Sequence, residues 1–505
     1  MSTVSRNIAY NLAGQSLLLI LGFVATKFIF GRLGEDALGI IYFSVTVSSV
    51  LFALLEAGIS STTAREVAAH FHDDQGYVRD LIRTTSTVNW ATYLLLALVL
   101  YFGAPFLVER WITLRTMDKL TAIRLVQILG IGGLAALPRS LYGGLLRGLQ
   151  RMEFNNAIDV SITTLQQCGT ILLLVVGQSI FHIAYWMVAC NMMGVLAYIF
   201  VSGRLFSGFA LIPGYSPGVV RRNIDYSAKV MNISILALVH TQTDKVILSK
   251  FLSVGTLGYY SFVYGLTARA SSLSDAIAQA VFPSFAALFK AGEHARVMMQ
   301  YRKLQDLVCL ASVPVFSAIV FYAEPLLAFV FGEGIARTLV IPVFFLSVGF
   351  YMHGTLVVPY FASLAAGRPD ITVRVNFLAL FIIVPATIGL IYYFGLAGAG
   401  FSWILYHLFV YAFGVPRICV ECLRIPVKEW YEHVARIAIA ASVTYGLAWE
   451  VFHSFGTARI SSATVAFLGG TVAFMLAAYW LMSDDLRAAM TRLLCAVRVR
   501  VDEPA

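Results

Sequence analysis

Long apolar stretches are the feature of this sequence that most limits what it can fold into. Segments of about 20 mainly apolar residues recur from Ile8 to Met482, and a helix of that length crosses the roughly 30 Å hydrocarbon core of a bilayer. Only 12% of the 505 residues are charged, too few to cover a water-soluble surface. In lipid such stretches are helical, because a helix satisfies its backbone polar groups within one segment. The sequence therefore predicts an all-α integral membrane protein.

We expect about fourteen membrane-spanning helices. In the first half their ranges are 8–30, 37–63, 87–108, 119–137, 157–177, 181–206 and 226–251. In the second half they are 256–289, 304–322, 336–366, 373–394, 397–419, 433–452 and 463–482. We interpret the first as a retained helix, because Arg6 precedes a full-length span and no convincing small-residue cleavage site follows it.

Basic residues gather in alternate loops. One set of loops carries Arg65, Arg79, Arg83, Arg147, Arg151, Arg221, Arg222, Lys229, Lys290, Arg296, Arg302, Lys303, Arg368, Arg374, Arg417, Arg424 and Lys428. The other set carries Arg32, Arg110, Arg115, Lys119, Lys250, Arg337 and Arg459. By the positive-inside rule the richer side is cytoplasmic and both termini lie there, as an even number of spans requires. The net charge of +9 is spread over these loops instead of forming a stripe, so no nucleic-acid partner is expected.

A weak internal repeat predicts how the helices are organised. Residues 32–43 align without gaps with residues 251–262, pairing Leu33 with Leu252, Leu38 with Leu257, Gly39 with Gly258 and Phe43 with Phe262. The same register places Glu56 opposite Asp275. Each copy joins the first span of a six-helix unit to its second, which indicates a parallel duplication.

The repeat leads to a division into lobes. We expect an N-lobe at 1–206, a cytoplasmic linker at 207–225, a C-lobe at 226–422, and two extra helices with a basic cytoplasmic tail at 423–505. The linker is basic and contains Pro213-Gly214 and Pro217-Gly218, which are typical of a loop.

Several segments resemble one known family. They are Gly31-Arg-Leu-Gly-Glu-Asp-Ala-Leu-Gly39 with Leu55-Glu-Ala-Gly-Ile59, Leu141-Tyr-Gly-Gly-Leu-Leu-Arg-Gly-Leu-Gln-Arg-Met152, and Gln242-Thr-Asp-Lys-Val-Ile-Leu-Ser-Lys250 with Leu257-Gly-Tyr-Tyr260. These segments resemble the polysaccharide, or O-antigen, flippases of the multidrug/oligosaccharidyl-lipid/polysaccharide exporter superfamily. The resemblance covers mainly the first eight spans; beyond Phe289 only the hydropathy is informative.

The resemblance implies a fold and a function. It implies two pseudo-symmetric six-helix lobes around a central cavity that opens alternately to each side of a bacterial inner membrane. The implied substrate is a polyprenyl pyrophosphate carrying an oligosaccharide, for O-antigen, capsule or exopolysaccharide. Membrane lipids, a polysaccharide polymerase and chain-length machinery are the partners it suggests. No cofactor is implied, and transport could be coupled to H⁺ or Na⁺.

Arg269 is the leading candidate for binding such a substrate, because it lies near the middle of its predicted span. Ser272 and Gln279 follow at helical spacing, and Asn11 and Gln15 share a face of the first helix. An arginine can bind a pyrophosphate with two charge-assisted hydrogen bonds. The structural alternatives are an ion pair inside a lobe for Arg269 and hydrogen bonds between helices for the polar faces.

Five further residues are candidates for coupling or gating. Glu56 and Asp275 could take up the coupling ion, although a structural salt bridge, for example with Arg65, is the favoured alternative for this pair. Lys27, Asp244 and Lys245 could form a gate near the periplasmic side, but snorkelling or local pairing is favoured.

Other intramembrane groups have structural interpretations first. His353 and His407 could titrate near neutral pH, but a lone intramembrane histidine more often bonds a neighbouring helix. Arg124 and Asp159 are assigned to packing within a lobe. Cys419 and Cys422 form a CxxC pair without a second pair or a nearby histidine, so no metal site is expected.

Other functions remain open. A peptidoglycan lipid-precursor flippase or an ion-coupled multidrug exporter would have a similar architecture, although a mid-membrane arginine argues against a site for cationic drugs. An enzyme of lipid-linked sugars is less favoured, because the longest periplasmic connection, 109–118, is short and lacks paired carboxylates. We expect no catalytic residues, and no P-loop sequence is present. A scaffold without transport is disfavoured by the intramembrane polar faces.

Overall fold

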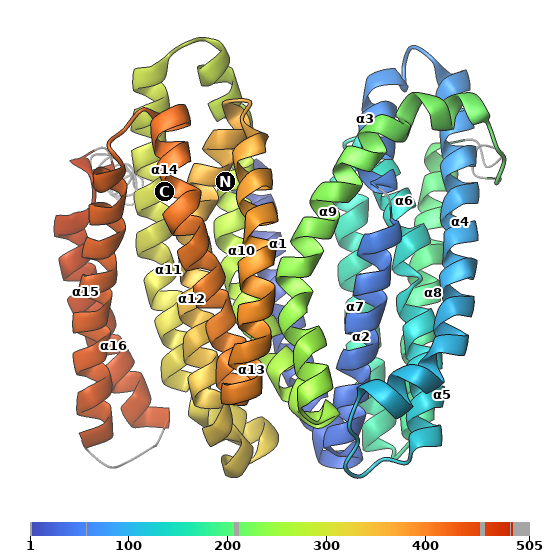
Figure 1. Ribbon diagram of the computed structural model, residues 1–505, viewed down its shortest axis with the longest axis horizontal. Helices are drawn as coiled ribbons and strands as arrows, with labels where there is room; N and C mark the ends of the chain where they lie inside the picture. The colour runs from blue at the N-terminus through green and yellow to red at the C-terminus, as the bar shows by residue number, and fades with distance from the viewer. Residues whose placement is uncertain (1–2, 57, 207–211, 455–459, 485, 488–505) are drawn as a thin grey trace, which may run out of the picture. The chain divides into compact units, whose positions relative to one another are not determined.

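A computed structural model describes residues 3–56, 58–206, 212–454, 460–484 and 486–487, and within these ranges it describes side chains from Leu17 onward except at residues 55, 273, 276, 280, 452, 453 and 460. These residues form helices almost throughout (Figure 1). Their one β feature is an isolated bridge between Thr113 and Ser253. In chain order the elements are α1 (Thr3–Leu33), α2 (Glu35–Leu55), α3 (Ile59–His70), α4 (Gln75–Phe106), η1 (Leu107–Trp111), α5 (Lys119–Gly133), α6 (Ala136–Gly148), α7 (Met152–Val175), α8 (Ile180–Leu205), α9 (Pro217–Phe251), α10 (Val254–Lys290), α11 (His294–Phe331), α12 (Glu333–Ala365), α13 (Pro369–Phe413), α14 (Val415–Arg417), η3 (Ile418–Leu423), α15 (Val427–Ser454) and α16 (Ile460–Leu481).

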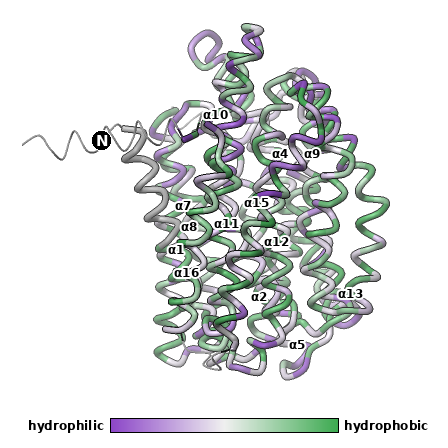
Figure 2. The backbone as a smooth tube through the Cα atoms, turned by 90° about the vertical axis from the view of Figure 1, so that its left-hand side faces the viewer, coloured by the Kyte–Doolittle hydropathy of each residue, from purple (hydrophilic) through white to green (hydrophobic). Residues whose placement is uncertain are grey.

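Eleven helical segments in the described part are long and apolar enough to cross a membrane. One of them, Pro369–Leu423, contains two helices, because Gly395 interrupts α13 with φ 56° and ψ −128°. Helices α1 and α9, of 31 and 35 residues, add two more of membrane-crossing length. Figure 2 shows hydrophobic residues along the helices and hydrophilic residues mainly toward their ends. The expected all-α membrane fold is confirmed.

The helices divide into two compact units, Met1–Ser261 and Phe262–Ala505. The division lies within α10, so that the first two turns of this helix belong to unit 1. Helix α9 packs on α2, α3 and α4 and is therefore part of unit 1. The predicted lobes at 1–206 and 226–422 stay a prediction.

Unit 1 is a bundle in which α5 packs on α2 and α8, α7 packs on α1 and α8, and α3 packs on α6. One core cluster joins α6, α7 and α8 through buried residues that include Leu141, Tyr142, Ile162, Cys190 and Tyr198.

Two helices of unit 1 begin at a capping residue that is visible in the sequence. Asp74 and Asp118 precede α4 and α5, and each carboxylate accepts a backbone N–H three residues later, at Tyr77 (2.9 Å) and Thr121 (2.8 Å).

The loops of unit 1 separate into two ends, as the charge pattern predicted. At one end, Lys250 in the last turn of α9 donates to the backbone oxygen of Arg110 in η1, which follows α4 (2.7 Å). At the other end, Arg83 near the start of α4 donates to the backbone oxygen of Ile212 before α9 (3.2 Å). The second end carries the richer set of basic residues and is the predicted cytoplasmic side.

Unit 2 is built on α11, α12 and α13, with α15 and α16 packed as a pair against α11. Buried residues of α11 and the last two helices, including Cys309, Phe321, Tyr445 and Phe474, form a core cluster. Asp306 on α11 ties this pair in place. Its carboxylate accepts the backbone N–H of Ser483 (2.7 Å) and lies 3.2 Å from Nε2 of His433.

Helix boundaries differ from the predicted spans where hydropathy is a poor guide. Helix α4 begins at Gln75 instead of residue 87, because a polar helical extension continues beyond the apolar part. The predicted span 37–63 is two helices, α2 and α3, separated where Gly58 adopts φ 67°. The predicted span 119–137 continues through a turn at Leu134 and Ala135 into α6, which ends at Gly148.

Candidate functional site

A cavity of about 310 Å³ lies in unit 1, between α2, α5, α6, α7 and α8, and its mainly apolar lining contains a set of polar side chains. Its polar lining comprises hydroxyl, amide and guanidinium groups, from Ser44, Ser48, Ser49, Arg139, Gln166 and Asn191. Among the described lining residues none is acidic. Because hydroxyls and amides both donate and accept hydrogen bonds, this lining suits a hydroxyl-rich ligand better than a cation.

Arg139 on α6 is the charged residue of this cavity. Its guanidinium pairs with the carboxylate of Asp159 on α7 and lies 5.6 Å from the ring centre of Tyr198 on α8. The Tyr198 hydroxyl donates to the same carboxylate (2.9 Å). The arginine is thus held by two helices, and a quarter of its side chain remains accessible.

Sequence reasoning missed Arg139. The predicted span 119–137 ends at Leu137, two residues before Arg139. In the structure Pro138 is the third residue of α6, where a proline is tolerated because its missing N–H has no partner within the helix. The signal in the sequence that could have indicated a second helix here is a proline in the first turn of an amphipathic stretch. Asp159, assigned to packing, does contact a neighbouring helix, but its partner lines the cavity.

The predicted binding residues of unit 2 share an exposed face of α10. Arg269, Ser272 and Gln279 are exposed, whereas Ser271 and Ser274 between them are buried. The Ser272 hydroxyl donates to the backbone oxygen of Arg269 (2.6 Å). The roles predicted for these residues stay predictions.

Two predicted binding residues, Asn11 and Gln15, lie in α1, but their side chains are outside the described part of the chain. Lys27, a predicted gate residue, is partly buried farther along the same helix. Its role as a gate residue stays a prediction.

Glu56 and Asp275 have different partners despite their equivalent repeat positions. The Glu56 carboxylate is buried and accepts the backbone N–H groups of Ser60 (2.7 Å) and Gly58 (3.0 Å) at the start of α3. Arg65, the example considered as its salt-bridge partner, pairs with Glu66 instead. Asp275 lies 3.5 Å from Nε2 of His353 on α12.

Asp244 and Lys245 are both buried in unit 1. Lys245 Nζ lies 3.4 Å from the Asp244 carboxylate and donates to the backbone oxygen of Thr241 (2.6 Å). The buried hydroxyl of Tyr260 on α10 donates to Asp244 (2.6 Å). Such local pairing is one of the two alternatives, with snorkelling, that the sequence favoured over a gate, and the gate role itself stays a prediction.

Sequence reasoning also missed the roles of Glu35 and Asp36, although both lie in the segment that carries the family resemblance. The buried Asp36 carboxylate accepts three consecutive backbone N–H groups, from Arg115 (2.8 Å), Thr116 (2.6 Å) and Met117 (2.9 Å). Glu35 accepts a hydrogen bond from the hydroxyl of Tyr259 (2.8 Å). These acids fasten the loop between α4 and α5 and the start of α10 to the start of α2.

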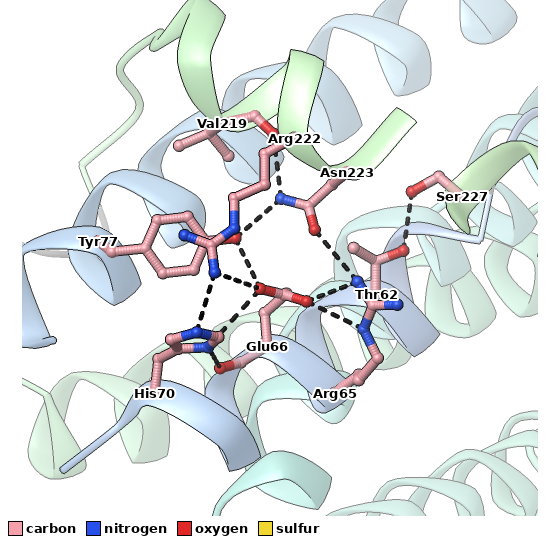
Figure 3. A network of polar contacts seen from close by, with 9 residues as sticks. All are labelled: Thr62, Arg65, Glu66, His70, Tyr77, Val219, Arg222, Asn223 and Ser227. Carbon is pink, nitrogen blue, oxygen red and sulfur yellow. Dashed lines mark hydrogen bonds and ion pairs between the residues drawn. The ribbon is translucent and has the colours of Figure 1, made fainter. Parts of the chain in front are cut away.

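A second polar network joins α3, α4 and α9 at the predicted cytoplasmic end of unit 1 (Figure 3). At its centre the buried Glu66 carboxylate accepts hydrogen bonds from Arg65 Nε (2.9 Å) and the Tyr77 hydroxyl (2.8 Å). From α9, Asn223 donates to the Tyr77 hydroxyl (2.9 Å), and the Arg222 guanidinium lies over the Tyr77 ring.

The network stabilises the charged form of Glu66. Burial raises the pKa of this carboxyl, but the hydrogen bonds from Tyr77 and Arg65 and the charge of Arg65 outweigh burial. His70 adds a smaller contribution in the same direction. The pKa of Glu66 is therefore lowered from its ordinary value of 4.5.

Comparison with known proteins agrees with this architecture. A candidate O-antigen transporter of Shigella flexneri is 22% identical over 410 residues, which are 79% of this chain and 94% of that protein. The solved structure of the lipid II flippase MurJ, in an inward closed conformation, matches with a TM-score of 0.69 at 12% identity, covering 93% of this chain and 98% of that one.

An inward-facing multidrug resistance MATE family transporter of the MOP superfamily matches with a TM-score of 0.65 at 14% identity, covering 80% of this chain and 95% of that one. At such identities the two solved structures show the fold alone. The sequence model of one family, described as polysaccharide biosynthesis protein, matches residues 4–289, from α1 to α10. Because this match spans more than half of the chain, the protein belongs to the polysaccharide biosynthesis protein family.

Proposed function

We propose that this protein flips a polyprenyl-pyrophosphate-linked oligosaccharide from the cytoplasmic to the outer leaflet of a bacterial inner membrane. The product would serve the synthesis of O-antigen, capsule or exopolysaccharide. Transport proceeds by alternating access, with both termini in the cytoplasm. The protein acts as a transporter and not as an enzyme.

The observation that carries this proposal is the lining of the cavity in unit 1. A head group of sugars and pyrophosphate offers hydroxyls and negative charge. Serines, amides and Arg139 match both chemistries. The family match and the likeness to a candidate O-antigen transporter support the same substrate class.

Two alternatives share the fold. A lipid II flippase would handle the same pyrophosphate and a related sugar, and the lipid II flippase MurJ has a similar fold. A multidrug exporter would also have this fold, which a MATE transporter shares, but a cationic drug would meet Arg139 without an acidic residue in the described lining.

The test is translocation in proteoliposomes that contain the purified protein. Three fluorescent probes are compared: a polyprenyl pyrophosphate carrying a short oligosaccharide, lipid II, and a cationic dye. We expect the first to reach the opposite leaflet fastest. Preference for lipid II or for the dye would replace the proposal with the corresponding alternative.

Arg269→Ala tests whether Arg269 binds the pyrophosphate of this substrate. If Arg269 receives the pyrophosphate, this variant loses translocation at limiting and at saturating substrate. Arg296→Ala is the matched control, because Arg296 is a highly exposed arginine of the same unit that pairs only with Glu293 three residues earlier among the described residues. Unchanged translocation by Arg269→Ala would exclude this role.

A further inference from the structure

A second cavity, of about 260 Å³, lies in unit 2 between the first turns of α11 and α15 and the end of α16. We call it the α15 cavity. It shares no lining residue with the cavity of unit 1, and none of the predicted binding or gating residues lines it. It is slightly smaller than the roughly 300–1,000 Å³ of pockets for drug-sized ligands, which suits one small polar group.

Helix lengths place the α15 cavity at the edge of the hydrocarbon core. Helix α16 has 22 residues and is therefore about 33 Å long, close to the thickness of the core at roughly 30 Å. Leu481, its last residue, and Ser483 just beyond it both line the cavity. The basic stretch 290–303 leads into α11 at the same end of unit 2, which is the predicted cytoplasmic side. The cavity thus lies at the level of lipid head groups.

The buried part of the lining holds polar atoms that lack partners. Tyr301 and Gln305 on α11 and Trp430 on α15 are each at most 3% exposed. The Trp430 indole N–H lies near the Tyr301 hydroxyl, but neither group makes a hydrogen bond of good geometry to any described residue. The side-chain oxygen of Gln305 also lacks one. Because buried polar groups are normally hydrogen-bonded, these atoms indicate a ligand that both donates and accepts.

The rim of the cavity carries two ion pairs. Arg302 on α11 donates to the carboxylate of Glu429 on α15 (2.8 Å). On α15 itself, a guanidinium nitrogen of Arg436 lies 3.7 Å from the carboxylate of Glu432. All four side chains keep more than two fifths of their surface accessible. Exposed ion pairs contribute little to stability, so their members can turn to a ligand at small cost.

The lining therefore offers charges of both signs. Besides the rim pairs it contains the buried carboxylate of Asp306, which lies 3.2 Å from the imidazole of His433. Three carboxylates stand against two guanidinium groups, so the lining has no excess of positive charge with which to favour a purely anionic ligand. A ligand that carries a phosphate and an ammonium group matches this arrangement better, since each sign meets its opposite.

An apolar stripe on α15 continues from the rim into the hydrocarbon. Ile439, Val443, Leu447 and Val451 follow Arg436 at an interval of three and then of four residues, so all lie within about 60° of it around the helix. Each is more than half exposed. An exposed apolar surface on a membrane-crossing helix suits acyl chains. Polar rim and apolar stripe together have the layout of a phospholipid.

We propose that the α15 cavity binds the head group of a membrane phospholipid that carries a phosphate and a primary ammonium, as phosphatidylethanolamine does. Arg302, Arg436 and the Trp430 indole donate to the phosphate, Glu429 and Glu432 accept from the ammonium, and the acyl chains follow the stripe on α15. The bound lipid connects α11 with the last two helices. It stays in place while the transported substrate moves, so this inference goes beyond the proposed function and does not depend on it.

The experiment is native mass spectrometry of the purified, delipidated full-length protein in detergent. It is titrated separately with phosphatidylethanolamine, phosphatidylcholine and phosphatidylglycerol that have identical acyl chains. Phosphatidylcholine has the same phosphate and net charge, but its quaternary ammonium has no N–H to donate, and phosphatidylglycerol has no ammonium. We expect one phosphatidylethanolamine to bind about tenfold more tightly than either, the effect of one charge-assisted hydrogen bond, and to raise the unfolding temperature most.

Two variants locate the binding. Trp430→Phe keeps an aromatic ring but removes the indole N–H, and Arg436→Ala removes an exposed guanidinium. Each should weaken binding of phosphatidylethanolamine about tenfold. Trp480→Phe, at an 80% exposed tryptophan of α16, and Arg296→Ala, at an exposed arginine outside the cavity, are the matched controls and should bind like the wild type. Thermal unfolding shows whether each variant is folded, and the exposed Arg436 gives the answer if Trp430→Phe is not.

Three results would overturn the proposal. The first is equal binding of the three lipids by the wild type, which would show that the head group is not recognised. The second is wild-type binding by both Trp430→Phe and Arg436→Ala, which would place the lipid elsewhere. The third is displacement of the lipid by an equal concentration of free phosphoethanolamine, which would make the cavity a site for a soluble ligand. In each case the proposed transport function stands.

Discussion

Gly258 of α10 lies directly against Gly39 of α2, two residues that occupy equivalent positions in the internal repeat. A Cβ atom on Gly258 would come within 3.0 Å of the backbone nitrogen of Gly39, and a Cβ on Gly39 would lie 2.1 Å from the backbone oxygen of Val254. Side chains cannot be accommodated at such distances without moving the backbone. The repeat thus places a glycine on each side of one close contact between the start of α2 and the start of α10, within unit 1.

Replacing Gly39 tests this contact. Gly39→Ala is expected to destabilise the protein by about 1–3 kcal/mol, because the added methyl group overlaps the backbone of Val254. Thermal unfolding in detergent measures the change. Gly31→Ala is the matched control, since no atom lies within 4 Å of its added Cβ, and it should leave the unfolding temperature nearly unchanged. Equal unfolding temperatures for both variants would show that the close contact is absent.

Removing the Asp36 carboxylate should release the loop between α4 and α5. Asp36→Ala leaves three backbone N–H groups without their acceptor, and each such loss costs about 1–3 kcal/mol where the group stays buried. We expect a lower unfolding temperature and faster proteolysis within 112–118. Asp118→Ala, which removes one exposed helix cap from the same loop, should have a smaller effect. A loop equally protected in both variants would contradict this anchoring role.

Glu66 should make stability depend on pH. A carboxyl whose folded pKa is lowered stabilises the fold above the unfolded value, and this contribution disappears as the pH falls through the folded pKa. The wild type should therefore exceed Glu66→Gln in unfolding temperature at neutral pH, and the difference should shrink below about pH 4.5. Glu153→Gln, at an exposed ion pair, serves as control and should show little difference at any pH. A Glu66→Gln difference that stays constant down to pH 3 would refute the assignment.

Arg139 should matter for transport more than for folding. Arg139→Ala is expected to reduce translocation of the oligosaccharide probe at least about tenfold, and Arg139→Lys should retain part of it, because lysine keeps the charge but not the planar fork. Arg124→Ala changes an exposed arginine of α5 and should be neutral. If Asp159→Asn reproduces the loss in both transport and unfolding temperature, Arg139 serves only to pack α6 against α7.

Hydropathy predicted the fold well because lipid imposes its constraint on each segment separately. A run of about 20 apolar residues spans the bilayer whatever its neighbours are, so the helices and their alternation could be read along the chain. Helix breaks and continuations were harder to predict from hydropathy. The break at Gly58 and the continuation through Pro138 depend on local backbone angles that an average over a span does not register.

The composition and order of the sequence by themselves determined a multi-pass helical membrane protein, its internal repeat and the side on which its basic loops gather. Only the tertiary structure decided which charged groups meet. Asp275 and His353 are distant in sequence, as are Arg139 and Tyr198, and each pair forms because helix packing sets the rotation and depth of the helices that carry it. The rotation and depth of a helix arise from its contacts with other helices, and the sequence of one helix alone does not encode them.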